Sequence, residues 1–191
     1  MEKELLIQKI TGKTAARPYH LPASFELVGH TFCLDLPEMG DLTLNFEKDR
    51  LLYNGKEAAY RAVKCEEDLY LIGFGRFLLL LDTKSTCAVF TNGRNCWSSF
   101  PEKENPLPGF ETVLRFGAEM RYPCIFEKDA VTLDKNRFPA LYLPYSDHQC
   151  LLLLETPAGG LVLIVDTARF LLYGGMDGDP CIGGCVRVEM E

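Results

Sequence analysis

The stretch LTLNFEKDRLLYNG, residues 42–55, carries the pattern that decides the fold. Apolar and polar residues alternate from Leu42 to Phe46, and a second short apolar run from Arg50 to Tyr53 follows a polar tetrapeptide. Alternation with a period of two is typical of a half-buried strand, and Asn54-Gly55 after an apolar run marks a tight turn. The stretch therefore predicts consecutive antiparallel strands joined by short turns.

The same stretch recurs later in the chain. Phe46-Glu47-Lys48-Asp49 returns as Phe126-Glu127-Lys128-Asp129, 80 residues further on. The match continues with Tyr60 against Tyr142 and with residues 78–83 against residues 162–167, where the offset is 84. Insertions in turns, around Asn136-Arg137 and in residues 157–160, account for the drift. We predict a duplicated β-meander. The alternative is that two unrelated meanders share an apolar-turn-apolar pattern.

Each copy contains short segments rich in Val, Leu, Phe and Tyr between clusters of Gly, Pro, Asn and Asp, which is typical of strands and turns. In the first copy we predict strands at 25–35, 42–46, 50–53, 58–65, 69–74, 77–82 and 86–91. In the second copy we predict strands at 112–120, 121–126, 130–134, 140–145, 149–155, 161–166 and 170–173.

These segments predict one compact domain in four parts. An N-terminal arm, residues 1–24, contains a short helix at Glu2–Ile10; the first meander is 25–97, a linker with three prolines is 98–109, and the second meander is 110–191. A meander has two exposed edges, and closure into a barrel removes both. The predicted fold class is therefore all-β, a lipocalin-like or calycin-like antiparallel barrel built from both meanders. Separate closure of the sheet in each half is the alternative.

The composition of the chain disfavours some classes of partner. The chain has 191 residues, 47% of them apolar and 25% charged, with a net charge of -7 and a pI near 5.1. An acidic chain without a basic patch disfavours nucleic acid as a partner. The N-terminus lacks the pattern of a secretory signal, and no apolar run is long enough for a membrane span, so we expect a cytoplasmic protein without a membrane partner. We expect its eight cysteines to be reduced, structural thiols.

The first copy resembles a known family. The resemblance covers Phe25–Gly93 and lies in the runs GHTF at 29–32, LTLNF at 42–46, YRAV at 60–63, DLYLIGF at 68–74 and LLLD at 79–82. With these runs the chain is similar to the MoaF family, named for molybdenum cofactor biosynthesis protein F. The resemblance implies a calycin-type barrel and a link to molybdenum cofactor or molybdoenzyme gene sets. It transfers no catalytic residue, because the matching positions are framework.

Large side chains with a polar tip suit the wall or mouth of a barrel cavity, since ligand pockets are mostly apolar with a few placed polar groups. We therefore predict ligand-binding roles for Tyr60, Tyr70, Arg76, Trp97, Tyr142 and His148. Tyrosines in strands serve equally well as core or surface residues, which is the alternative. The expected ligand is a small apolar or aromatic molecule, and its identity and the oligomeric state stay open.

Three other groups of residues could have a catalytic or metal-binding role, but a structural role explains each of them more simply. Asp147-His148 suits proton transfer, but no nucleophile accompanies it and a solvated turn explains it. Asp82 and Asp166 end equivalent strands and suit a shared cation, but Asp-Thr also opens a turn. Cys181 and Cys185 are spaced for a metal without a second ligand pair, so we interpret residues 181–185 as a glycine-rich tail. We predict no metal, no cofactor and, without a phosphate-binding loop, no nucleotide.

Three hypotheses follow. The first is a calycin-like binding or carrier protein whose cavity is lined by both copies. The second is a barrel-cavity enzyme, a lyase or isomerase with Tyr, Arg and His as acid-base groups, which requires at least two titratable groups that converge in the cavity. The third is a protein-interaction module with an exposed apolar patch. We favour the first and leave catalysis open.

Overall fold

The computed structural model describes residues 1–12, 22–116 and 120–187, with side chains through residue 182. Its strands pair antiparallel throughout the described registers, so the prediction of an antiparallel all-β protein is confirmed. The contacts between Cα atoms group the described residues into two compact units. The N-terminal unit takes residues 22–101 and 176–180, and the C-terminal unit takes residues 1–12, 102–175 and 181–187. The predicted linker contains the main boundary, while the sequence interpretation had treated both copies as one domain.

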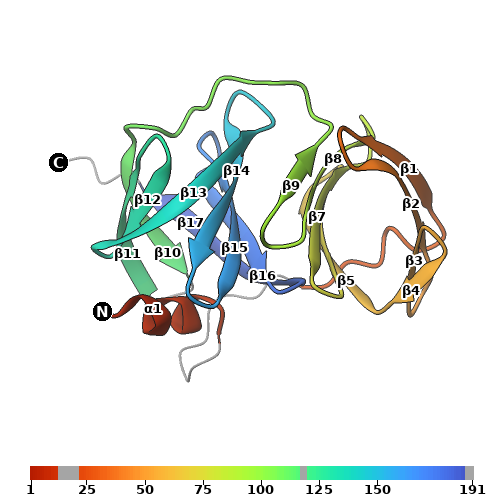
Figure 1. The fold of residues 1–191 in the computed structure, drawn as a ribbon, viewed down its shortest axis with the longest axis horizontal. Helices are drawn as coiled ribbons and strands as arrows, with labels where there is room; N and C mark the ends of the chain where they lie inside the picture. Colours follow the sequence, from red (N-terminus) through yellow and green to blue (C-terminus); the bar gives the residue numbers. More distant parts are fainter. Residues whose placement is uncertain (13–21, 117–119, 188–191) are drawn as a thin grey trace. The chain divides into compact units, whose positions relative to one another are not determined.

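The N-terminal unit contains two sheets, with the strand orders β1-β2-β3-β4 and β5-β6-β7-β8-β9. In Figure 1 the strands of both sheets curve around one centre. Their bounds are β1 Thr31–Leu36, β2 Gly40–Phe46, β3 Leu51–Tyr53, β4 Lys56–Ala58, β5 Tyr60–Glu66, β6 Leu69–Phe74, β7 Phe77–Asp82, β8 Cys87–Thr91 and β9 Cys96–Ser98.

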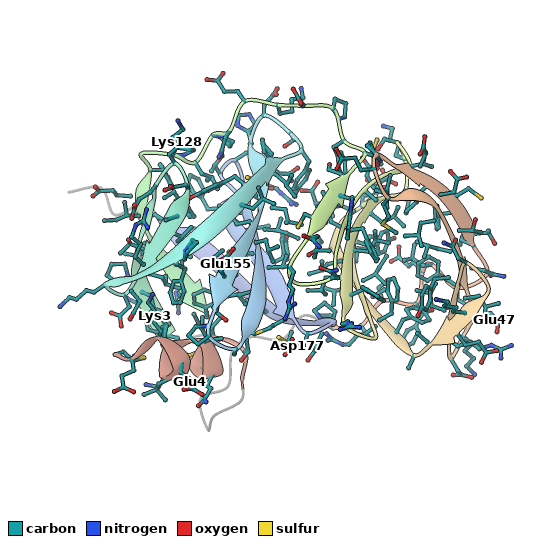
Figure 2. All side chains as sticks on the ribbon, viewed as in Figure 1. Lys3, Glu4, Glu47, Lys128, Glu155 and Asp177 are labelled. Atoms are coloured by element: carbon teal, nitrogen blue, oxygen red, sulfur yellow. The ribbon has the colours of Figure 1, made fainter. Side chains whose placement is uncertain are left out.

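Alternate residues of these strands build the core of the N-terminal unit. In β2, Leu42, Leu44 and Phe46 are buried while the residues between them face outward. Aromatic rings continue the core around the unit, with ring centroids 5.3 Å apart for Phe46 and Tyr60. Figure 2 shows side chains throughout the space that the strands enclose. In β2 the period of two read from the sequence is therefore the period of burial, whereas every residue of β6 is buried.

The C-terminal unit is a closed barrel of the strands β10 to β17 in sequence order. β10 pairs with β11 on one side and with β17 on the other, Leu114 standing opposite both Tyr122 and Val186. The bounds are β10 Glu111–Phe116, β11 Met120–Phe126, β12 Ala130–Leu133, β13 Asn136–Pro144, β14 Gln149–Thr156, β15 Gly159–Asp166, β16 Leu171–Met176 and β17 Asp179–Arg187. Closure gives each of these eight strands a hydrogen-bonded neighbour on both sides.

The helix α1, Lys3–Ile10, belongs to the C-terminal unit (Figure 1). It buries Leu6, Ile7 and Ile10 almost completely. Lys3, labelled in Figure 2, donates a hydrogen bond to the carbonyl oxygen of Arg137 at 2.6 Å, and its ammonium lies 5.2 Å from the centroid of the Phe138 ring. The helix predicted at residues 2–10 is confirmed; no described helix is long and apolar enough to cross a membrane.

The two copies share hydrogen bonds at the offset read from the sequence. The backbone N–H of Gly29 donates to the carbonyl oxygen of Phe46, and 80 residues later Gly109 donates to Phe126, at 2.7 and 2.8 Å. Asn54 and Asp134 both have a φ of 47°, in the equivalent turns after β3 and β12. The repeat is therefore present in the backbone and not only in the pattern of residue types.

Three predictions are corrected. A barrel shared by both copies is wrong, because β10 and β17 close the second copy on itself. The glycine-rich tail at 181–185 is wrong, because those residues lie in β17. The strand predicted from Phe25 begins at Thr31, because residues 26–29 form a turn in which His30 N–H bonds to the Leu27 carbonyl oxygen. The short strands β4 and β9 were not predicted, since Lys-Glu-Ala and Cys-Trp-Ser lack the apolar run that marks the equally short β3, Leu-Leu-Tyr.

Candidate functional site

A partly open pocket of about 490 Å³ lies in the N-terminal unit. Its lining comes from three stretches of the first copy: the turn before β1 with the start of β1, the hairpin of β5 and β6, and the residue after β7. The lining residues are Glu26, Leu27, His30, Phe32, Lys64, Glu67, Asp68, Tyr70 and Thr83. The volume is that of a small-molecule site.

Three polar side chains of the lining form one connected group. The ammonium of Lys64 and a carboxylate oxygen of Glu26 are 2.6 Å apart, and the hydroxyl of Tyr70 donates to the same oxygen at 2.8 Å. Lys64 and Tyr70 are cross-strand partners in the β5–β6 hairpin, so their side chains project from the same face of the sheet. The register of that hairpin therefore positions two of the three groups.

The backbone around the pocket is held from two sides. The turn over residues 26–29 carries Glu26, with Val28 N–H donating to the carbonyl oxygen of Phe25 at 3.1 Å. Across the pocket, the N–H and the hydroxyl of Thr83 donate to the carbonyl oxygen of Asp68 at 2.8 and 3.2 Å. These bonds tie the β5–β6 turn to the end of β7, so the lining carboxylates of that turn project from a fixed backbone.

Aromatic rings form the less polar part of the lining. The rings of His30 and Phe32 stack with their centroids 6.3 Å apart and an interplanar angle of 24°. Phe32 meets the buried Phe46 edge-on at 6.0 Å, which anchors this pair to the core. Stacked rings with one anchored member offer a fixed face for a flat ligand.

The contacts among Glu26, Lys64 and Tyr70 shift the pKa of each group so that the form it ordinarily has at neutral pH is favoured. The hydrogen bond from Lys64, followed by that from Tyr70, lowers the pKa of Glu26, and the hydrogen bond to Glu26 raises the pKa of Lys64. Burial, followed by the hydrogen bond to Glu26, raises the pKa of Tyr70. At neutral pH the group is therefore a carboxylate, an ammonium and a protonated phenol.

Of the six residues predicted to bind a ligand, Tyr70 lines this pocket. Tyr60 packs against the core, and its hydroxyl donates to the carbonyl oxygen of Glu47, labelled in Figure 2, at 2.9 Å. Trp97 packs on Phe90 with ring centroids 5.9 Å apart, and Arg76 is exposed in the turn between β6 and β7. These three residues belong to the N-terminal unit and lie outside the lining.

Tyr142 and His148 belong to the C-terminal unit. The hydroxyl of the half-buried Tyr142 donates to the carbonyl oxygen of Ala130 at 2.7 Å, and burial raises the pKa of this phenol. His148 is exposed in a turn, and its neighbour Asp147 forms an ion pair with Lys103 at 3.1 Å. The interpretation of His148 as a solvated turn residue is confirmed.

The other candidate groups have structural roles. Asp82 and Asp166 each accept two backbone N–H groups from the residues two and three positions later, so the turn interpretation is confirmed. The seven cysteines with described side chains are free thiols, and burial raises the pKa of Cys150 to about 12. The side chain of Cys185 lies outside the described residues. Within the described part of the chain, no three His, Cys, Asp or Glu side chains are grouped to hold a metal ion.

Sequence reasoning did not single out Glu26, His30 or Lys64 as lining residues. One usable signal was present: with strands predicted at 58–65 and 69–74, the intervening turn sets Lys64 opposite Tyr70. Glu26 and Thr83 gave no such signal, because they lie outside the β5–β6 hairpin and only the three-dimensional fold brings them to the pocket.

The fold and the pocket define an antiparallel β-protein that carries a ligand-sized cavity in its first copy. No protein family model matches the chain, and no curated protein matches it.

Proposed function

We propose that this protein binds a small aromatic molecule in the N-terminal pocket, as a cytoplasmic, calycin-like binding or carrier protein. The observation that carries the proposal is the combination of a cavity of about 490 Å³, the stacked His30–Phe32 pair and a fixed polar group beside it. A flat ligand with polar substituents fits this lining, because the rings supply contact area and the polar groups fix the orientation. The MoaF resemblance implies a link of the protein to molybdenum cofactor or molybdoenzyme gene sets.

The enzyme alternative draws on one observation, the convergence of Glu26, Lys64 and Tyr70 in one cavity. A general acid or base works best when its pKa is near the working pH. Here the pKa values of Lys64 and Tyr70 are raised and that of Glu26 is lowered, all of them away from neutrality. This arrangement supports fixed recognition of a ligand over proton transfer by these three groups.

The interaction-module alternative needs a contiguous apolar patch. Phe25, with 70% of its surface exposed, lies before β1, and the other exposed large apolar side chains lie in α1 (Leu5), β11 (Ile125) and β13 (Leu141), before α1 (Met1) and before β16 (Phe170). Exposed apolar side chains on separate elements are ordinary for a protein surface.

The test is native mass spectrometry of protein purified from its own host, compared with its denatured mass. We expect a retained small molecule in the wild type and about a fivefold lower occupancy in His30→Ala, because that variant loses one ring of the stacked pair. His148→Ala is the matched control, since it removes an exposed histidine of the C-terminal unit. A wild type that retains nothing and binds no member of an aromatic fragment library would overturn the proposal.

A further inference from the structure

We infer that the ligand of the N-terminal pocket is an organic cation, an aromatic body that carries a protonated amine. This inference rests on the proposed function and names the ligand class of the same site.

The charges of the lining do not balance. Three carboxylates, those of Glu26, Glu67 and Asp68, face one ammonium, that of Lys64. Lys64 and Glu26 are 2.6 Å apart and offset one another. The carboxylates of Glu67 and Asp68 remain: within the described residues neither lies at ion-pair distance from a cation, and Glu67 acts on Lys64 only from a longer distance, raising its pKa. With three carboxylates and one ammonium, the lining carries an excess of two negative charges, and the one ammonium interacts with both Glu26 and Glu67.

These two carboxylates are exposed lining residues of a turn whose backbone is fixed. Asp68 accepts the N–H and the hydroxyl of Thr83 at its carbonyl oxygen, so its own backbone position is set while its side chain is not engaged. A cation that enters the pocket meets the carboxylates without displacing any existing partner. The net charge of -7 on the chain favours the approach of such a cation over that of an anion.

The rings of the lining favour the same charge. The ammonium of Lys64 already lies 6.0 Å from the centroid of the Tyr70 ring, and the stacked His30 and Phe32 add further aromatic faces. The face of an aromatic ring attracts cations through its quadrupole. Carboxylates combined with aromatic faces are a chemistry that recognises organic cations.

An anionic ligand meets the opposite conditions. Its partner would be Lys64, which Glu26 already occupies in a group that Tyr70 reinforces at 2.8 Å. The anion would have to displace Glu26 and then face Glu67 and Asp68. Breaking a charge-assisted hydrogen bond without a better replacement costs affinity.

The test uses three probes of matched size on the full chain: phenethylamine as the cation, 2-phenylethanol as the neutral form and phenylacetate as the anion. Binding is followed by calorimetry and by NMR shifts of the lining residues, at low and high salt. We expect phenethylamine to bind about tenfold more tightly than 2-phenylethanol at low salt, because the two exposed carboxylates attract its ammonium group. The preference should be smaller at high salt, because dissolved ions screen this attraction. Phenylacetate should bind least.

The double variant Glu67→Gln/Asp68→Asn should abolish the preference for the amine. The control Asp35→Asn/Asp41→Asn changes the net charge equally, in the paired strands β1 and β2 and outside the lining, and should keep the preference. If the neutral probe binds as tightly as the amine, the proposed function stands and the inference falls. Tightest binding of phenylacetate also overturns it. If no probe binds, the exact mass of the molecule retained from the host identifies its composition, and a neutral or anionic molecule refutes the inference. If no molecule is retained either, both proposals are refuted.

Discussion

Asp82 and Asp166 occupy equivalent turns in the two copies and have different surroundings. Both accept backbone N–H groups, but the second carboxylate oxygen of Asp166 also accepts the side chains of Gln149 at 2.9 Å and Arg169 at 2.8 Å. Asp166 is 2% exposed, while Asp82 is half-buried. The repeat thus offers a matched pair in which one aspartate opens a turn and the other, itself buried, also binds the side chains of the half-buried Gln149 and the exposed Arg169.

We predict that Asp166→Asn lowers the free energy of unfolding by about 2 kcal/mol, because it removes an ionised acceptor from buried hydrogen bonds. Asp82→Asn, the matched control, should lower it by less than about 1 kcal/mol. Urea unfolding followed by circular dichroism measures both. Equal losses in the two variants would contradict the role assigned to Gln149 and Arg169.

The same pair gives a pH dependence. Burial raises the pKa of Asp166, but hydrogen bonds from the Arg169 backbone and side chain and from Gln149 outweigh it, so the pKa lies below the ordinary value of 3.8. The stabilisation by the ionised group is therefore complete above that value and is lost as the pH falls through the lowered pKa. The difference between wild type and Asp166→Asn should be constant near neutrality and shrink below the ordinary value. A difference that grows on acidification would refute this assignment.

Among residues of the pocket, sequence reasoning found Tyr70 and missed its partner Glu26. Tyr70 stood out because a tyrosine in a strand can line a cavity or join the core. Glu26 and Lys64 are 38 residues apart, and a salt bridge at that separation depends on how the turn before β1 lies against β5. A local pattern reports which residues share a strand face, so it cannot report which distant turn meets that face.

At the scale of elements, β16 shows how closely two strands of the barrel approach. A Cβ added at Gly174 would lie 2.2 Å from the carbonyl oxygen of Val162 in β15, closer than real Cβ contacts. Gly109, in the same unit, has a φ of +85° and nothing within 4 Å of such a Cβ. The two glycines therefore separate a steric requirement from a conformational one.

We predict that Gly174→Ala destabilises the barrel by about 3 kcal/mol, because the backbone of β15 has to shift. Gly109→Ala should cost about 1 kcal/mol, the strain of a left-handed conformation with a side chain. Thermal unfolding measures both, and hydrogen exchange in β15 and β16 localises the effect. A tolerated Gly174→Ala would show that the two strands adjust their separation.

Strand prediction succeeded for alternating runs such as β2 and for continuous apolar runs such as β6, and it failed where pairing alone makes the strand. The pattern of Leu42 to Phe46 was sufficient to predict β2, whose alternate side chains are buried. β17 contains Gly183-Gly184, which reads as a flexible tail, yet Gly184 pairs with Phe116 of β10. Glycine disfavours a strand locally, so only the ladder to a strand 68 residues earlier makes this segment a strand.

In the whole chain, the N-terminal helix packs in the C-terminal unit, although the first meander lies between them in the sequence. α1 precedes the first meander but groups with the second, where Leu6, Ile7 and Ile10 are buried. Leu6 is 0% exposed and its neighbour Leu5 is 42% exposed. The single tryptophan, Trp97, lies in the N-terminal unit and reports on that unit alone.

We therefore predict that Leu6→Ala lowers the stability of the C-terminal barrel by about 3 kcal/mol, the usual cost of a cavity at a buried leucine. Leu5→Ala, the control on the exposed face of the same helix turn, should change it by less than about 1 kcal/mol. Hydrogen exchange should rise in β14, which α1 contacts, while the unfolding transition seen by Trp97 fluorescence should keep its midpoint. A Trp97 transition that shifts as far as the exchange in β14 would show that the helix stabilises both units, and the grouping of α1 with the second meander alone would then be wrong.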